Sequence, residues 1–169
     1  LSSWRIAYTG AEPVRHDTMD AFSQRFASAG FDAGAVYPCY GLGEATLFVT
    51  GGRRGNGMVV SRFDDSALGD RRVQPDLEGA ALVGCGSVPH GHHVRIADPD
   101  TGRPAGDGVI GEIWAAGASI ASGYWNKPAE TAQAFVERDG TRWLRTGDLG
   151  FLHDGHLFVA GRLKDMIIV

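Results

Sequence analysis

A short segment at residues 38–47 brings together side chains that suit a nucleotide. Tyr40 offers an aromatic face for a purine, and Gly41 lets a phosphate approach the backbone closely. Glu44 follows with a carboxylate, which is a ligand that Mg²⁺ prefers. The segment therefore predicts an adenine and phosphate site with a metal ligand beside it.

The same glycines allow a second interpretation, a dinucleotide-binding fold. Asp64 follows at about the 20-residue distance at which such folds place their ribose-binding acid. However, Thr46 stands where the third glycine of that fingerprint belongs, and Gly51 interrupts the chain too soon for a long helix. Without that helix there is no N-terminus to hold a pyrophosphate, so we prefer the adenine and phosphate interpretation.

The segment at residues 38–47 resembles the aromatic-Gly-x-Thr-Glu core motif of adenylate-forming enzymes, and especially that of fatty-acyl-AMP ligases. Gly43 departs from the many family members with a small or hydroxyl side chain there, which puts one phosphate contact in doubt. The resemblance continues in order along nearly the whole chain. The further matching segments are residues 10–12, 111–128, 145–150 and 161–165.

Site residues follow from this resemblance, position by position. It implies that Asp148 accepts hydrogen bonds from both ribose hydroxyls, each charge-assisted bond contributing about 1.5–3 kcal/mol, although residues 146–148 could also form only a turn. Arg162, otherwise a surface cation, would reach the ribose and phosphate, and Asp165 would be the hinge to a mobile C-terminal domain. The nucleotide-binding residues implied are Gly10, Ala11, Glu12, Tyr40, Gly41, Leu42, Asp148 and Arg162, with Glu44 as the metal ligand.

Two of the matched segments leave their roles open. Glu12 could serve the nucleotide site, or it could simply favour the N-terminus of the following helix. The segment at residues 111–128 has no obvious titratable pair, so we assign it no catalytic role. No complete catalytic machinery is expected within the chain.

The function implied by the resemblance is activation of a fatty acid by ATP. The carboxylate would attack the α-phosphorus to give acyl-AMP and pyrophosphate, Mg²⁺ would offset the phosphate charge, and the phosphopantetheine of an acyl carrier protein would accept the acyl group. The family's phosphate loop and C-terminal lysine are missing from this chain, so we expect it to be inactive alone. An acyl-CoA synthetase and a non-enzymatic nucleotide-binding module remain the alternatives.

The elements that position these residues differ between the two halves of the chain. A strand at residues 4–9, a helix at 14–29 and a strand at 35–37 indicate an α/β half with a mostly parallel sheet. Short strands at 93–96, 110–115, 143–145 and 157–159, with one helix at 128–135, indicate a small, mostly β subdomain. We therefore expect an α/β portion at residues 1–60 and a mostly β subdomain at 83–169.

Between these parts, residues 61–82 form a polar, weakly periodic stretch. Fatty-acyl-AMP ligases resemble acyl-CoA synthetases but carry an extra segment about here. That insertion is expected to hinder the domain movement that lets CoA react. A plain surface loop is the competing interpretation.

Composition narrows the class of protein further. The chain has 169 residues and a formal net charge of -4, with no long basic block, which argues against nucleic acid as a partner. No run approaches the roughly 18 apolar residues of a membrane span, so we expect a cytoplasmic protein. Cys39 and Cys85 are expected to be buried thiols, although a thioester nucleophile is an alternative. The chain begins without Met and stops in the apolar run from Met166 to Val169, so we expect it to continue in both directions.

Overall fold

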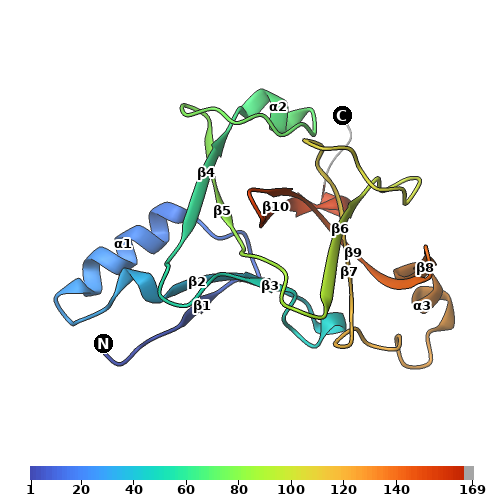
Figure 1. Cartoon of the computed structure of the whole chain (residues 1–169), viewed down its shortest axis with the longest axis horizontal. Coiled ribbons are helices and arrows are strands. Elements are labelled where there is room, and N and C mark those ends of the chain that lie inside the picture. The colour runs from blue at the N-terminus through green and yellow to red at the C-terminus, as the bar shows by residue number, and fades with distance from the viewer. Residues whose placement is uncertain (166–169) are drawn as a thin grey trace.

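Two β-sheets form the framework of the chain, with α1 beside the smaller sheet at one end and α3 at the other (Figure 1). The computed structural model describes residues 1–165, so the apolar run from Met166 to Val169 lies outside the described residues. The smaller sheet has the strand order β1-β2-β3. The larger sheet has seven strands, in the order β4-β5-β10-β9-β7-β6 with β8 paired to β9.

The smaller sheet comes from the first 51 residues and has the expected strand-helix-strand order. β1 and β2 are parallel, as predicted, whereas β3 adds an antiparallel strand that the sequence analysis missed. The intervening helix has 12 residues, and no described helix is long and apolar enough to cross a membrane. The elements are β1 (Ala7–Thr9), α1 (His16–Ala27), η1 (Ala33–Ala35), β2 (Val36–Tyr40), η2 (Gly43–Ala45) and β3 (Thr50–Gly51).

The larger sheet is antiparallel throughout and holds every strand predicted for the second half. Its central strand, β9, is much longer than the predicted residues 143–145, because Thr146 and Gly147 interrupt the apolar alternation without ending the strand. The helix predicted to reach residue 135 ends one residue earlier, where buried Phe135 begins β8. The elements are β6 (His92–Ala97), β7 (Gly111–Gly117), α3 (Pro128–Ala134), β8 (Phe135–Arg138), β9 (Thr141–His153), β10 (His156–Arg162) and η3 (Leu163–Asp165).

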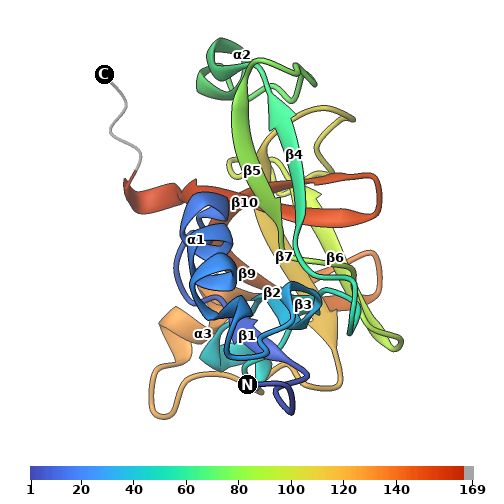
Figure 2. The ribbon, with the colours of Figure 1, turned by 90° about the vertical axis from the view of Figure 1, so that its left-hand side faces the viewer.

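The polar stretch at residues 61–82 begins and ends inside paired strands. β4 (Val59–Phe63) and β5 (Ala80–Gly84) form a hairpin in which Ser61 pairs with Leu82, and α2 (Asp65–Gly69) lies beyond them at the top of Figure 2. The apolar alternation typical of a strand is weak here, because β4 is an edge strand whose residues are mostly exposed. Only the middle of the stretch is therefore a surface excursion, while whether it is an insertion stays a prediction.

One core cluster crosses from the smaller sheet to the larger one. Tyr40, Ala45 and Val49 pack in the same buried cluster as Leu144 and Leu157. Burial of aromatic and aliphatic side chains in one cluster fixes the two sheets against each other. The segment at residues 38–47 is thereby held against the middle of the larger sheet.

Candidate nucleotide site

The carboxylate of Asp148 accepts hydrogen bonds from two other predicted nucleotide-binding residues. The Tyr40 hydroxyl donates a hydrogen bond of 2.7 Å to Oδ2 of Asp148. Nε of Arg162 donates to Oδ1 at 3.0 Å, because Arg162 lies directly opposite Asp148 in the β9–β10 pair. Asp148 is only 8% exposed, so these contacts form at the margin of the core. The fold thus brings together residues that the sequence places in three separate motifs.

The pKa values of Tyr40 and Arg162, the two partners of Asp148, are both raised. Burial raises the pKa of the Tyr40 hydroxyl far above its usual value. The hydrogen bond to Asp148 raises the pKa of Arg162. A carboxylate offers about four lone-pair sites, so Asp148 can accept a ribose hydroxyl in addition to these two donors.

Glu44 lies in η2 and contacts a residue from the segment at 111–128. The Tyr124 hydroxyl donates a hydrogen bond of 2.6 Å to Oε1 of Glu44. The backbone N–H of Ala121 also donates to the Glu44 carbonyl at 2.8 Å. The hydrogen bond to Glu44 raises the pKa of Tyr124 to about 12, so its hydroxyl remains a donor at neutral pH. The Tyr124 contact sets the direction of the carboxylate, and the Ala121 contact holds the backbone of Glu44.

The donor set at Glu44 fits a magnesium ion that shares its coordination with a nucleotide. Among residues 1–165, no hydrogen bond or ion pair reaches the second oxygen of Glu44, Oε2. The described residues also contain no cluster of three or more His, Cys, Asp or Glu that could hold a metal alone. Mg²⁺ usually takes one or two carboxylates together with waters and substrate phosphates, which matches a single available carboxylate oxygen.

The glycines of this segment have different structural roles. A Cβ atom on Gly41 would lie 1.5 Å from the Leu47 carbonyl oxygen, so only glycine fits at this position. A Cβ on Gly43 would meet open space, so this position could accept a side chain. The turn at Gly43–Ala45 is only three residues long. A dinucleotide-binding helix is therefore absent here, and that alternative is wrong.

The turn at residues 10–12 lies at the carboxyl end of β1, next to the end of β2. Thr9 is in register with Pro38, and a Cβ on Gly10 would lie 2.6 Å from the Cys39 carbonyl oxygen. Ala11 has a φ of 68° and is exposed, as is Glu12. Ligands of open α/β sheets bind at the carboxyl ends of strands, which suits the predicted role of this turn.

Glu12 does not belong to the helix that follows it. That helix begins at His16, and Asp17 is the acidic residue in its first turn. The helix-terminus alternative for Glu12 therefore has no support, since the dipole effect falls off within the first turn. Its role at the nucleotide site stays a prediction.

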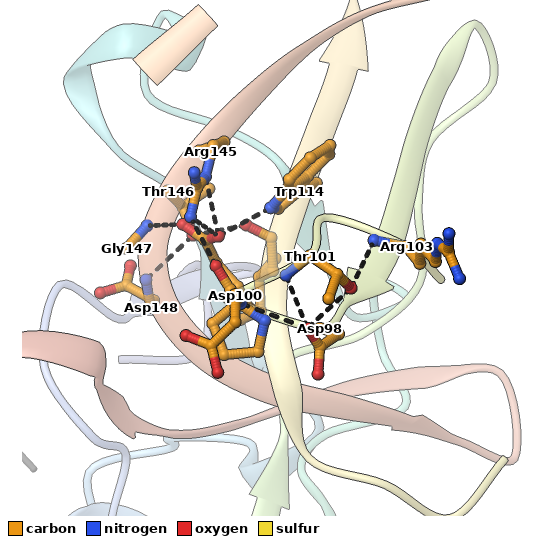
Figure 3. A network of polar contacts seen from close by, with 12 residues as sticks. Asp98, Asp100, Thr101, Arg103, Trp114, Arg145, Thr146, Gly147 and Asp148 are labelled. Carbon is orange, nitrogen blue, oxygen red and sulfur yellow. Dashed lines mark hydrogen bonds and ion pairs between the residues drawn. The ribbon is translucent and has the colours of Figure 1, made fainter. Parts of the chain in front are cut away.

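The segment at residues 111–128 takes part in two polar pairs that were not predicted, each with a partner outside the segment. Tyr124 holds Glu44, as described above. Glu112 is 2% exposed and pairs with Arg145, with 2.8 Å between its Oε2 and Nη2 (Figure 3). An acid inside a strand of otherwise buried apolar residues requires a buried partner, and this was the signal available in the sequence.

The remaining predicted residues lie at the edge of the site or away from it. Leu42 packs against the core cluster of Tyr40, and Asp165 is exposed in η3, three residues after Arg162. Burial raises the pKa of the Cys85 thiol to about 12, which disfavours a nucleophilic thiolate. The hinge role of Asp165 stays a prediction.

Residues 1–125 match the model of the AMP-binding enzyme family, and the chain belongs to this family. Among solved structures, the fatty acyl-adenylate ligase from Legionella pneumophila, in complex with acyl adenylate and pyrophosphate, is 46% identical. It aligns with 99% of this chain and 30% of its own, with a TM-score of 0.92. This agreement confirms the predicted fold class, an α/β part followed by a mainly β part of an adenylate-forming enzyme.

Two sequence relatives differ in the acyl acceptor that their names describe. The medium-chain fatty acid acyl-carrier-protein ligase JamA of Moorena producens is 41% identical over an alignment of 179 positions, which covers 100% of this chain and 30% of JamA. FadD21 of Mycobacterium tuberculosis, named as a putative fatty-acid CoA ligase, is 42% identical over an alignment of 173 positions, which covers 95% of this chain and 29% of FadD21. The chain thus spans about 30% of the length of such relatives.

Proposed function

We propose that this chain is the nucleotide-binding part of a ligase that activates a fatty acid with ATP as acyl-AMP. The observation that carries the proposal is the convergence of Tyr40 and Arg162 on the buried carboxylate of Asp148. These residues come from three motifs of the family, and the arrangement is suited to a ribose. The similarity to a ligase solved with acyl adenylate and pyrophosphate supports the same reaction.

In the proposed reaction, a carboxylate oxygen of the fatty acid bonds to the α-phosphorus of ATP. The bond from that phosphorus to the oxygen bridging to the β-phosphate breaks, and pyrophosphate leaves with the bond electrons. Asp148 orients the ribose, and the turn at residues 10–12 places backbone groups beside the reacting phosphate. Their contribution is to position the substrates, which in general supplies a large part of rate enhancement.

Glu44 would hold Mg²⁺ through its available oxygen, Oε2. The ion, when bound, offsets negative charge on the phosphates. Tyr124 keeps the carboxylate of Glu44 turned in one direction through the 2.6 Å hydrogen bond.

An acyl carrier protein is the acceptor that we propose, through its phosphopantetheine thiol, in a cytoplasmic enzyme. The name of JamA supports this choice, while the name of FadD21 keeps CoA as the alternative. The tip of the β4–β5 hairpin lies at the top of Figure 2, away from β2 and β3, where Arg71 and Val73 bond to residues 108–110. It could therefore oppose movement of a further domain without touching the nucleotide site.

The direct test uses the full-length protein, ATP, Mg²⁺ and a medium-chain fatty acid. We expect pyrophosphate release together with acyl-AMP, measured by mass spectrometry. Omitting the fatty acid is the control for simple ATP hydrolysis. AMP binding without any acyl-AMP would instead favour the non-enzymatic nucleotide-binding module.

The acceptor is tested by shortening the hairpin tip. Removing residues 61–82 would also delete Phe63, which is fully buried against Phe151 and Phe158. A Gly-Ser-Gly link can replace residues 65–70 instead. This keeps the bonds of Arg71 and Val73 to residues 108–110 and the packing of Val73, and it removes only Leu68 from the same cluster.

The shortened protein should still form acyl-AMP but produce about 5- to 150-fold more acyl-CoA, the range of typical coupling energies. Acyl-CoA and acylated carrier protein are measured in the same reaction. An unchanged acyl-CoA yield in a folded protein that still makes acyl-AMP would show that the tip does not exclude CoA.

A further inference from the structure

The strand that carries Asp148 is distorted at the site itself. Glu112 lies opposite Leu149, and Trp114 lies opposite Arg145, so Ile113 alone on β7 faces residues 146–148 on β9. The extra residues form a bulge, and Gly147 within it has a φ of 72°. Bulges near functional sites commonly redirect a side chain. Here the bulge sets where the carboxylate of Asp148 points.

Glu112 binds this bulge from the neighbouring strand. Its Oε1 accepts a hydrogen bond of 3.2 Å from the backbone N–H of Gly147, the residue just before Asp148. Its Oε2 accepts from Nε of Arg145 at 3.0 Å and from Nε1 of Trp114 at 2.8 Å. The carboxylate thus joins the bulge in β9 to the neighbouring strand β7. Its three donors, Gly147, Arg145 and Trp114, converge in Figure 3.

Thr146 supports the bulge from the other side. Its hydroxyl donates to the Ile113 carbonyl at 2.7 Å and accepts the backbone N–H of Asp148 at 3.1 Å. Arg145 extends the network outward, because its Nη2 donates to the Pro99 carbonyl at 3.1 Å (Figure 3). Every one of these contacts ends on the bulge or on a residue next to it.

We propose that Glu112 is a positioning residue for ribose recognition, acting through Gly147 and Arg145 on the bulge that carries Asp148. This inference rests on the proposed function, since it requires that Asp148 bind the ribose. Glu112 would act on the nucleotide only through the bulge. Its loss should therefore change the preference between nucleotides, an effect that a purely structural ion pair would not have.

The competing explanation is a buried ion pair that only stabilises the sheet. Removing one partner of such a pair leaves an uncompensated buried charge and destabilises strongly, whereas replacing both partners by apolar side chains is often tolerated. The double variant Glu112→Met with Arg145→Met therefore separates the two explanations. It keeps the volume of the pair but leaves the Gly147 N–H without its acceptor.

The experiment compares ATP with 2′-deoxy-ATP in fatty-acid-dependent pyrophosphate release by the full-length protein. Wild type should prefer ATP by roughly 10- to 100-fold in kcat/KM, the range expected for a hydrogen bond to a charged group. The double variant should reduce this preference to about three-fold, mainly through a higher KM for ATP. Glu112→Gln keeps one acceptor oxygen, so its preference should lie between the double variant and wild type. KM for the fatty acid should stay unchanged. Asp148→Ala sets the level for complete loss of ribose recognition.

Trp143→Phe is the matched control, because Trp143 packs with Trp114 in the same buried cluster, and among the described residues its Nε1 has no hydrogen-bond partner. It should lower the melting temperature and leave the ATP preference at the wild-type value. If the double variant is folded and keeps the full preference while Asp148→Ala loses it, Glu112 has no positioning role. If wild type itself forms no acyl-AMP, or if Asp148→Ala keeps the preference, the proposed function or the ribose assignment fails instead.

Discussion

The two carboxylates of the site are held in different ways. Asp148 is 8% exposed and receives donors on both oxygens, from Tyr40 and from Arg162. Glu44 is half-buried and receives one hydroxyl, from Tyr124, on one oxygen. A carboxylate that binds a ribose is more selective when hydrogen bonds hold it in one orientation. A carboxylate that binds a metal together with a substrate needs an oxygen that is free to coordinate the metal. The difference predicts that damage to Asp148 is felt in nucleotide affinity and damage to Glu44 in metal dependence.

Asp148→Ala should have the largest effect. It removes the proposed acceptor of the ribose hydroxyls and leaves the Tyr40 hydroxyl and Arg162 without their shared partner. We expect nucleotide binding to weaken by roughly 2 kcal/mol, measured by calorimetry on the full-length protein. Circular dichroism confirms folding. Wild-type affinity in a folded variant would contradict the assignment.

Glu44→Gln tests the other side of the comparison. The amide keeps the shape and can still accept the Tyr124 hydroxyl, but it lacks the charge that attracts a hard cation. We expect adenylation to fall by about ten-fold and the Mg²⁺ concentration for half-maximal rate to rise, with little change in AMP affinity. Superimposable magnesium titrations of variant and wild type would assign Glu44 a structural role only.

Tyr40→Phe should have a smaller effect, confined to the Asp148 side. It deletes one hydrogen bond and leaves the Arg162 contact in place. Loss of such a bond to a charged group corresponds to about 1.5 kcal/mol in nucleotide affinity, with an unchanged magnesium titration. Stopped-flow or calorimetric AMP binding measures it. A shift in the magnesium dependence instead would mean that the two carboxylates are coupled.

Tyr124→Phe should have the smallest effect, and its signature is pH dependence. The pKa of Tyr124 is raised from 10.0 to about 12 in the folded protein, so the hydrogen bond to Glu44 stabilises the fold fully below pH 10. That stabilisation is lost as the pH rises toward 12, because the unfolded chain then releases the proton more readily.

The measurement is the difference in unfolding free energy between wild type and Tyr124→Phe from pH 8 to pH 11. It should be constant at first and decrease above pH 10. A difference that stays flat over the whole range would place the Tyr124 hydroxyl away from Glu44 in solution.

Local sequence patterns predicted the helices and strands well where apolar side chains recur at a regular spacing. The stripe of Met19 and Phe22 identified α1, and short apolar runs identified most strands of the larger sheet. The β4–β5 hairpin was obscured because β4 is an edge strand with exposed residues. The extent of β9 was obscured by its bulge, since residues 146–148 look like a turn when their partner strand is unknown.

The site itself could be predicted only in part. Motif order indicated that Asp148 and Arg162 belong to one site, but the contact from Tyr40 depends on how the two sheets pack, which no local pattern contains. The sequence shows Glu112 as an acidic residue among apolar ones. Its hydrogen bond from the backbone N–H of Gly147 depends on the register of β7 and β9, which the sequence does not show. Contacts that depend on register and packing are those that local sequence patterns leave open.

The wide separation of Tyr40 and Asp148 along the chain, 108 positions, also constrains how this protein is made. Chains emerge from the ribosome at roughly 5–20 residues per second, so the partner of the Tyr40 hydroxyl appears several seconds after Tyr40 itself. Contacts between distant residues form late because the loop between them must first be closed. Recovery of nucleotide binding during refolding should therefore follow the recovery of sheet structure. The proposed nucleotide site can form only after the two sheets have packed together.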